Sequence, residues 1–573
     1  MRTRREHYYT FGPFRLEPDE CRLLCDGLQI PLTPKAFAML LLLVRNSGRL
    51  VDKEFLMNEL WPDAFVEESN LTFSISVLRK ALRQTAQTAS YIETVPKRGY
   101  RFIAAVREVH TENDVKSLAV LPFVNLSSGE DGEYFADGLH DALISELARI
   151  ASLRVISRTS SVQYKSATWT VPAFARALQL DVVVEGSVLL EDDRVRISVR
   201  LIDAPDDRYL WTQSYERHRR DVLSLQSEMA RAIAAEIEVK VTTDEVDRLR
   251  NAQTIDPEAH AEYLRGRYHW HQFFTASGMT TAISHFRKAI QIEPGYSRAW
   301  AYLSGCFSAM AVQSMLPPAE AALEGKNAAK QALALAPLLP ESHISMAATH
   351  LFFDWDWSAA ESAIKSALDL SLNCEAHGLF THYALARGWG QQAIAAQRRA
   401  LDLDPMSATM NIDLIWAHLL NREYDKALEV SLGTQHMKFS YPLQHMYVGQ
   451  LYLCTKKYEE AIAEMEKALP IEDEAPAPIL AMLGCAYGLA GNSDAALSML
   501  RRLQELSRRC YVSPYDRAVI YTGLGEAADA LRCLVEALDD RTPRMIWLKV
   551  EPTFDSLRGD RRFEDIVLRL GLE

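Results

Sequence analysis

The residues best suited to chemistry in this sequence are basic side chains gathered near its beginning. Between residues 69 and 101, six Lys or Arg residues face a single acidic residue, Glu93, which gives a local balance of +5. The six are Arg79, Lys80, Arg83, Lys97, Arg98 and Arg101. Such groups bind phosphate, and their clustering is the electrostatic footprint of a nucleic-acid-binding module. A charged run is also typical of an ordinary solvated face, so the elements that carry it must decide.

The net charge of the whole chain conceals this cluster. The formal charge of the 573 residues is −13, which taken alone argues against nucleic-acid binding. Residues 1–110, however, hold 16 Lys and Arg against 13 Asp and Glu, a balance of +3, and the remainder carries −16. The sequence therefore indicates a basic binding module attached to an acidic protein.

The cluster follows a sheet and two helices that the sequence predicts. Residues 8–30 alternate short apolar runs with turn signals, which favours a small antiparallel sheet. Thr33-Pro34 opens a helix that ends at residues 46–48, because Pro suits the first turn and Gly the end. A second helix over residues 52–60 stops at Trp61-Pro62, since the residue before a proline resists helical geometry.

A third helix, starting near residues 67–69, carries the first basic residues. At 100° per residue, Leu71, Ile75, Leu78 and Leu82 form one apolar stripe. The opposite face contains no acidic residue; it consists of Ser69, Phe73, Ser76, Val77 and Lys80, flanked by Asn70, Thr72, Arg79 and Arg83. Residues 91–95 and 99–104 then predict a β-hairpin with a basic tip over residues 96–99. This arrangement favours a helix that reads the DNA major groove beside a flanking finger.

Residues 8–104 resemble the winged-helix DNA-binding domain of the OmpR/PhoB response-regulator family. The matching segments are LTPKAFAMLLLLVRNSGRLVDKEFLMNELWP, NLTFSISVLRKAL and YIETVPKRGYRF. The resemblance implies that residues 69–82 are the recognition helix. It implies base contacts for Asn70, Phe73, Ser76, Val77 and Lys80, phosphate contacts for Thr72 and Arg79, and a wing made of Lys97, Arg98 and Tyr100.

The same resemblance implies an RNA polymerase contact through the loop over residues 63–68 and a tendency to form homo-oligomers. The sequence departs from better-known members at Ser76 and Val77, where those often carry arginine, so their operator cannot be transferred. An alternative is a vestigial winged helix that serves only as part of a protein-interaction scaffold.

Residues 115–245 predict an α/β layer domain. Strands are expected at residues 117–124, 153–156, 182–190, 195–202 and 209–215, with helices at 133–150, 172–180 and 223–239. This segment resembles the TolB-like domain found beside winged helices and tetratricopeptide repeats. The acidic residues Glu130, Asp131, Glu133, Asp137 and Asp141 are interpreted as a polar loop and helix start rather than a metal site.

Residues 255–573 predict a helical repeat array. Alanines that begin an Ala-x-x-x-large-x-x-Ala pattern recur at Ala282, Ala360, Ala393, Ala427, Ala461, Ala495 and Ala530. After a first interval of 78 residues, which leaves room for one more unit, the intervals are 33, 34, 34, 34 and 35 residues. A 34-residue period is typical of about eight tetratricopeptide units, whose superhelix offers a concave groove to a protein or peptide. Residues 552–572 are expected to be a final helix that caps the last unit.

Motifs that imitate catalytic or metal sites lack their necessary context. Gly523-x-Gly525 has no preceding strand, Ser362-x-x-Lys365 has none of its usual partners, and Cys21 with Cys25 has no second ligand pair. An enzyme hidden in the middle domain stays an alternative without a motif. We therefore expect no enzymatic activity, no cofactor and no bound metal.

Together these observations predict a multidomain protein. The expected domains are a winged helix (α+β) at 8–106, a TolB-like α/β domain at 115–245 and an all-α tetratricopeptide superhelix with a capping helix at 255–573. Charged residues interrupt residues 102–123, so we expect that this junction does not span a membrane, and the N-terminal segment is not expected to act as a secretory signal. The sequence predicts a cytoplasmic, sequence-specific regulator of transcription that binds double-stranded DNA and resembles HilA- and CadC-type regulators.

Overall fold

The structure is a computed structural model, and it divides the chain into two compact units, Met1–Asp114 and Val115–Glu573. It describes residues 6–12, 14–17, 22–25, 28–30, 32–60, 69–82, 91–96, 98–104, 106–111, 116–127, 130–150, 152–166, 169–191, 194–218, 222–237, 255–270, 276–434, 442–469 and 476–572.

The first unit begins with the predicted antiparallel sheet. Strands β1 (Glu6–Phe11), β2 (Phe14–Glu17), β3 (Arg22–Cys25) and β4 (Leu28–Ile30) follow one another across it. A fifth strand, β8 (Arg107–Thr111), pairs antiparallel with β1. The first unit therefore extends past residue 106, where the sequence placed its end, because β8 completes the sheet from the far end of the unit.

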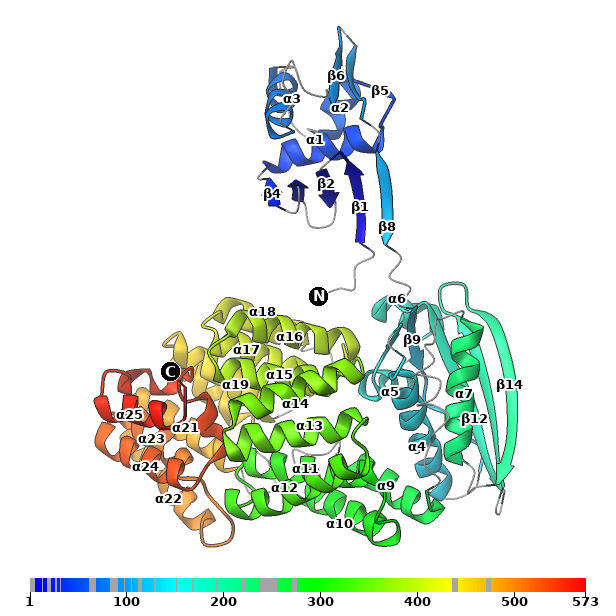
Figure 1. The fold of residues 1–573 in the computed structure, drawn as a ribbon. Coiled ribbons are helices and arrows are strands. Elements are labelled where there is room, and N and C mark those ends of the chain that lie inside the picture. The colour runs from blue at the N-terminus through cyan, green and yellow to red at the C-terminus, as the bar shows by residue number, and fades with distance from the viewer. Residues whose placement is uncertain are drawn as a thin grey trace. The chain divides into compact units, whose positions relative to one another are not determined.

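Three helices and a three-stranded sheet complete this unit (Figure 1). Helix α1 (Pro34–Arg45) starts as predicted, with the Thr33 hydroxyl accepting a hydrogen bond from the backbone N–H of Ala36 at 3.3 Å. Strand β5 (Leu50–Asp52) leads into α2 (Lys53–Leu60), and α3 covers Ser69–Ala81. Strands β6 (Ile92–Val95) and β7 (Gly99–Phe102) form the wing and pair with β5 in the order β5-β7-β6.

The second unit begins with a mixed sheet. Strands β9 (Lys116–Val120), β11 (Leu153–Val155) and β12 (Val182–Glu191) run parallel, whereas β13 (Arg194–Asp203) and β14 (Arg208–His218) continue from β12 as antiparallel neighbours. A short strand, β10 (Val124–Asn125), pairs with the far end of β12. The sheet order is β11-β9-β12-β13-β14.

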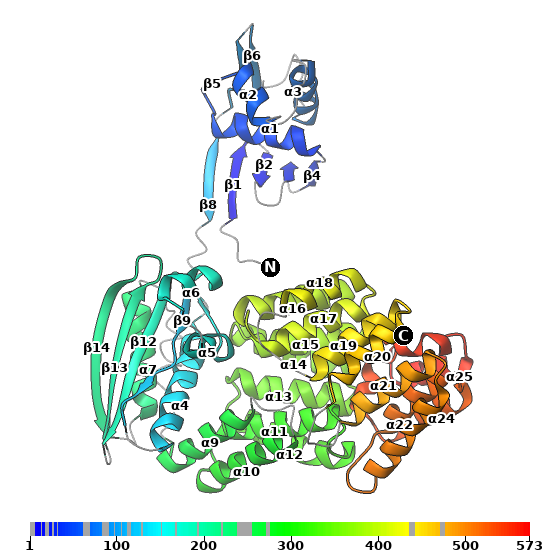
Figure 2. The ribbon, with the colours of Figure 1, turned by 180° about the vertical axis from the view of Figure 1, so that it is seen from behind.

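Helices α4 (Glu130–Leu147), α6 (Val171–Leu178) and α7 (Val222–Glu236) match the three predicted helices of this region. One further helix, α5 (Arg158–Ser166), was not predicted, because its sequence RTSSVQYKS shows no apolar periodicity. Helix α4 lies between the sheet and the first repeat helices (Figures 1 and 2), and it contacts both β9 and α9.

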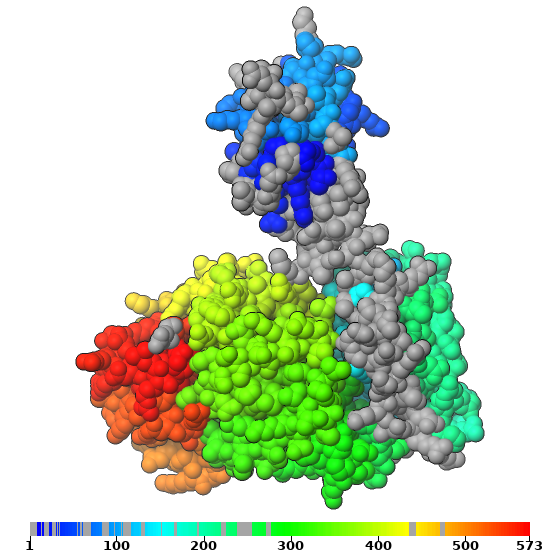
Figure 3. Space-filling model, viewed as in Figure 1, coloured from blue at the N-terminus to red at the C-terminus, as the bar shows by residue number. Residues whose placement is uncertain are grey.

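The repeat region consists of paired helices. The described pairs are α9 (Pro257–Trp270) with α10 (Ala276–Ile292), α11 (Ser297–Val312) with α12 (Pro318–Leu335), α13 (Pro340–Thr349) with α14 (Trp357–Leu370), α15 (Cys374–Ala386) with α16 (Gly390–Leu403), α17 (Ala408–Leu420) with α18 (Tyr424–Thr434), α19 (Pro442–Cys454) with α20 (Tyr458–Glu466), α21 (Ala477–Leu489) with α22 (Ser493–Leu506), and α23 (Pro514–Leu524) with α24 (Ala527–Asp539). These helices pack side by side, and together they form one continuous surface (Figure 3). A one-turn π-helix, η2 (His350–Asp354), extends α13 and helps to explain the long first interval.

The repeated alanines lie where helices touch. Ala282, Ala360, Ala427 and Ala530 are all fully buried, as their spacing predicted. One position differs: in α22 the buried alanine is Ala496 rather than Ala495, and the apolar positions that follow are Met499 and Leu503. Ala495 and Ala496 are neighbours in the sequence, and only packing selects between them.

The middle domain and the repeats, which the sequence separated into two domains, share one compact unit. Arg267 of α9 donates to the Asp141 carboxylate of α4 at 3.0 Å, and Arg298 of α11 donates to Glu146 at 3.1 Å. A second contact lies beyond α16, where the Ser160 hydroxyl donates to the Asp404 carboxylate at 2.6 Å. Because these groups are buried, the polar contacts fix the domain at two places along the array.

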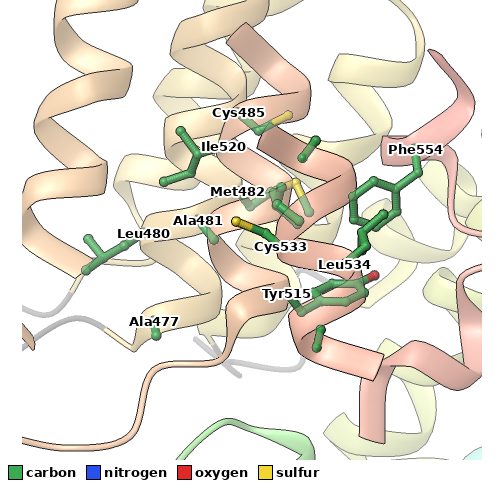
Figure 4. Packing of buried hydrophobic residues seen from close by; sticks show 14 of the residues in the cluster. Ala477, Leu480, Ala481, Met482, Cys485, Tyr515, Ile520, Cys533, Leu534 and Phe554 are labelled. Atoms are coloured by element: carbon green, nitrogen blue, oxygen red, sulfur yellow. The ribbon is translucent and has the colours of Figure 1, made fainter. Parts of the chain in front are cut away.

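After α24 the chain does not end in the single capping helix that was predicted. Two 3₁₀-helices, η4 (Pro543–Trp547) and η5 (Pro552–Leu557), precede a helix α25 (Arg561–Arg569). Tyr515 of α23 packs edge-on against Phe554 of η5 beside Leu534 (Figure 4), with a distance of 5.3 Å between the two ring centroids. Among the helices that the structure describes, none is long and apolar enough to cross a membrane.

Candidate nucleic-acid interface

Helix α3 presents one buried and one exposed face. Leu71, Ile75, Leu78 and Leu82 are at most 2% exposed and pack into the core of the first unit. This is the stripe that the 3.6-residue period predicted. Burial of these four side chains fixes the rotation of α3 about its axis and so determines which residues face outward.

The outward face carries polar groups, one cation and one aromatic ring. Asn70, Thr72, Ser76 and Lys80 are exposed, and the ring of Phe73 is 70% exposed. An amide, a hydroxyl and an apolar ring are side chains that read base edges and thymine methyl groups, and an ammonium group binds phosphate. No residue of α3 is acidic, so this face carries no negative charge that would repel the phosphates of a nucleic acid.

Two residues of the predicted interface have contacts within the unit instead. Val77 is half-buried and packs against the core. Arg79 is also half-buried, and its guanidinium donates to the Ile92 carbonyl at 2.9 Å and to the Thr94 hydroxyl at 2.7 Å. Arg79 therefore joins α3 to the first strand of the wing, a structural role that its position in a basic cluster did not reveal.

The wing contributes a second positive site. Arg98 is exposed at its tip, and Glu93, the acidic residue of the wing, forms an ion pair with Arg101 at 3.1 Å. Gly99 allows the tip to approach β5 closely, because a Cβ at this position would lie 2.0 Å from the Val51 carbonyl oxygen. The backbone N–H of Lys53 donates to the Arg98 carbonyl at 3.2 Å and ties the tip to α2.

Tyr100 lies in the core of the first unit and not on the exposed surface of the wing, where it was predicted to be. Its side chain is only 4% exposed and belongs to the core of the first unit. In β7, successive residues point to opposite faces, and Tyr100 occupies the inward position between Gly99 and Arg101. The side chains of Ser69 and Lys97, together with the loop over residues 63–68, lie outside the described residues.

A histidine and a serine in the second unit lie close together but form a buried contact. His140 and Ser161 lie 3.1 Å apart between Nε2 and Oγ, but neither is exposed to solvent. Burial, with the nearby Arg158 guanidinium, lowers the pKa of His140 to about 4. In the acidic stretch, Asp137 pairs with Arg158 and Asp141 with Arg267, so both carboxylates already have protein cations.

The glycine motif of α23 is also structural. Gly525 ends the helix in the left-handed region at φ +79°, which glycine adopts without steric strain. Gly523 lies against α21, where a Cβ would approach the backbone of Cys485 to 2.6 Å or less. These glycines serve a turn and a close helix contact, as the sequence indicated.

Two family models match the chain. Residues 27–102 match "Transcriptional regulatory protein, C terminal", and residues 114–232 match "HilA/YgeH-like transcriptional regulator, second domain". The first match covers α1, α3 and the wing. The second covers the mixed sheet and most of the helices that pack against it.

Individual relatives resemble different parts of the chain. The transcriptional regulator HilA of Salmonella typhi is 22% identical over 539 residues, which cover 91% of this chain and 92% of HilA. Putative adenylate cyclase 3 of Rhizobium meliloti is 36% identical over 188 residues, covering 33% of this chain and 32% of the cyclase. The solved DNA-binding domain of Escherichia coli CadC is 28% identical; it covers 18% of this chain and 100% of that domain, with a TM-score of 0.18.

The two family matches fall on the two segments for which the sequence predicted an OmpR/PhoB-type winged helix and a TolB-like middle domain; the model that matches the second segment is described as HilA/YgeH-like. The HilA relative spans both segments and the repeats that follow them. The chain is therefore a DNA-binding transcriptional regulator with an OmpR/PhoB-type domain, a HilA-like second domain and a helical repeat region.

Proposed function

We propose that this regulator recognises a specific duplex sequence by inserting α3 into the major groove. The observation that carries the proposal is the two-sided character of α3. Its apolar stripe is buried, while its opposite face exposes Asn70, Phe73, Ser76 and Lys80 without an acidic neighbour. A helix of this kind can enter the major groove and place several side chains against base edges at once.

Each exposed group has a distinct chemical role in this proposal. The Asn70 amide and the Ser76 hydroxyl hydrogen-bond base edges, and the Phe73 ring contacts thymine methyl groups. Lys80 and Arg98 bind phosphates on either side of the helix and fix its register. Thr72 supplies a further phosphate contact, and Arg79 holds the wing in position.

Selection of random duplex DNA by the full-length protein, read by sequencing at two salt concentrations, tests this proposal. We expect an enriched motif for the wild-type chain and an altered motif for Asn70→Ala and Phe73→Ala. Leu432→Ala, an exposed change on helix α18 of the second unit, is the matched control and should select the wild-type motif. Absence of enrichment by the wild-type protein would favour the scaffold with a vestigial winged helix.

We further propose that the repeats mediate protein contacts and that the protein acts in the cytoplasm without enzymatic activity. Long repeat arrays offer extended surfaces for partners or for self-association. In this proposal the loop over residues 63–68 contacts RNA polymerase on the promoter. Sedimentation of the full-length protein with and without its selected DNA measures self-association, and in vitro transcription with loop substitutions measures the polymerase contact.

A further inference from the structure

The chain after α24 returns across the first helices of the repeat pairs. We define residues 541–572 as the C-terminal strap. Its first element, η4, packs against α11, η2 and α15, although these lie more than 150 residues earlier in the sequence. The helices that η4 and η5 touch, α11, α15 and α23, are first members of their pairs, which line the concave side of a tetratricopeptide superhelix, whereas α25 packs against α24.

Trp547 is the aromatic anchor of the strap. Its indole N–H donates to the His382 carbonyl at 3.1 Å, and the ring is 5% exposed. The ring packs edge-on against Trp416 at a centroid distance of 4.7 Å and lies 6.1 Å from Phe352. Three successive helix pairs therefore build one aromatic seat for a single side chain.

Two arginines provide polar anchors before this ring. Arg544 pairs with the fully buried Asp516 and lies over the Tyr515 ring at 4.6 Å. Arg541 donates to the Phe353 carbonyl at 2.7 Å. A buried carboxylate needs a partner cation, so the Asp516 seat selects an arginine at this point.

The far end of the strap has more exposed contacts. Arg422 and Asp555 form a bidentate ion pair at 2.6 and 2.7 Å, with side chains 38% and 47% exposed. The indole N–H of Trp357 donates to the Leu570 carbonyl at 3.1 Å. The exposed ion pair contributes little stability, so this end is held chiefly by buried apolar side chains such as Phe563 and Leu570, each 2% exposed.

We propose that the concave face of the array is a peptide receptor whose resident ligand is the C-terminal strap. A partner binds this face by displacing the strap. The binding segment of the partner has the same chemistry as the strap: an arginine precedes an aromatic residue by three positions. This inference deepens the partner role proposed above by naming its surface and the chemistry of its ligand.

The form of the strap supports an exchangeable ligand. Its first half consists of two short 3₁₀-helices, whose hydrogen bonds are poorer than those of an α-helix. Besides the polar and aromatic contacts, the side chains of Ile546, Leu548 and Phe554 are fully buried in the core of the array. The tether nevertheless holds the strap at an effective concentration on the order of millimolar, so a free segment competes poorly until the strap is weakened.

A labelled peptide with the sequence of residues 540–551 is the probe, and fluorescence anisotropy with the full-length protein is the measurement. The wild-type protein should not bind it at about 100 µM, a tenth of that effective concentration. Trp547→Ala should weaken the strap roughly a hundredfold or more, as truncation of a buried aromatic does, and should bind the probe. Trp211→Ala, on β14 of the middle domain, removes an equally large ring away from the strap and should behave as wild type. A probe with alanine in place of its tryptophan should not bind.

Hydrogen exchange on the wild-type full-length protein supplies a readout that needs no variant. The strap amides should exchange through openings at least tenfold more frequent than those of α17, and Asp555→Ala should increase that ratio further. The proposal is overturned if the strap amides exchange only together with those of α17, or if a folded Trp547→Ala protein does not bind the probe. Either result would show that the strap is a fixed part of the core. Neither result would affect the DNA selection, so the two proposals fail independently.

Discussion

Arg79 and Lys80 are adjacent in the sequence, yet the structure gives them different roles. Lys80 is exposed on α3, whereas the Arg79 guanidinium donates two hydrogen bonds to the wing, at 2.9 Å to Ile92 and 2.7 Å to Thr94. Hydrogen bonds from charged donors contribute about 1.5–3 kcal/mol, and solvent exposure of Thr94 weakens the second of them. We therefore expect Arg79→Ala to reduce the free energy of unfolding of the winged helix by about 2 kcal/mol.

Lys80→Ala should change DNA binding without changing stability. Each phosphate contact contributes about 0.9 to the slope of log K against log salt, so the slope should fall by about 0.9. The double variant Lys80→Ala, Arg98→Ala should lose about 1.8. Arg79→Ala should lower affinity, because the wing is no longer fixed, while leaving the slope unchanged.

Residues 1–114, a compact unit with its own core, suit this comparison. Calorimetry gives the midpoint of unfolding, and a destabilisation of about 2 kcal/mol should lower it by about 10 °C. Thr94→Val is the control, since it removes one acceptor of Arg79 without changing charge and should reproduce part of the loss. An Arg79→Ala protein with the wild-type midpoint and a slope reduced by about 0.9 would show that Arg79 binds phosphate and would refute this reasoning.

Three further predictions concern the exposed ring, the contact between domain and repeats, and a buried histidine. Replacing thymine by deoxyuracil at the position that Phe73 contacts should lower the DNA affinity about fourfold, because a buried methyl group contributes about 0.8 kcal/mol. The affinity of Phe73→Ala should not depend on the thymine methyl group. If it depends on that group as the wild-type affinity does, Phe73 is not in the interface. Arg267→Met should destabilise the second unit by about 3–5 kcal/mol in urea unfolding, because it removes the cation that pairs with the buried Asp141 carboxylate; a loss below about 1 kcal/mol would contradict that pairing. The pKa of His140 is lowered to about 4, so its neutral form stabilises the fold above the unfolded value of about 6.5, and this stability is lost as pH falls from 6.5 to 4. His140→Gln should reduce that acid destabilisation by about 3 kcal/mol, and equal acid sensitivity in the variant would disprove it.

Much of the DNA-binding unit could be predicted because its signals are local. Thr33-Pro34 marks the start of α1, and the period of Leu71, Ile75, Leu78 and Leu82 fixes both the helix and its buried face. The sites that differed depend on contacts at a distance. Tyr100 turned inward with the pleat of β7, and Arg79 found acceptors on β6 that no spacing within α3 could indicate.

The amino-acid sequence by itself determined the amphipathic character of α3, the presence of a mixed α/β segment and the 34-residue period of the repeats. These properties follow from periodicity and turn chemistry over a few residues. The tertiary structure alone decided that Ala496 is the buried alanine of α22, that the middle domain joins the repeats, and that Trp547 lies among rings from three earlier helix pairs. The contacts of the middle domain and of Trp547 connect residues more than a hundred positions apart, and only the path of the folded chain determines which of many apolar or charged side chains become neighbours.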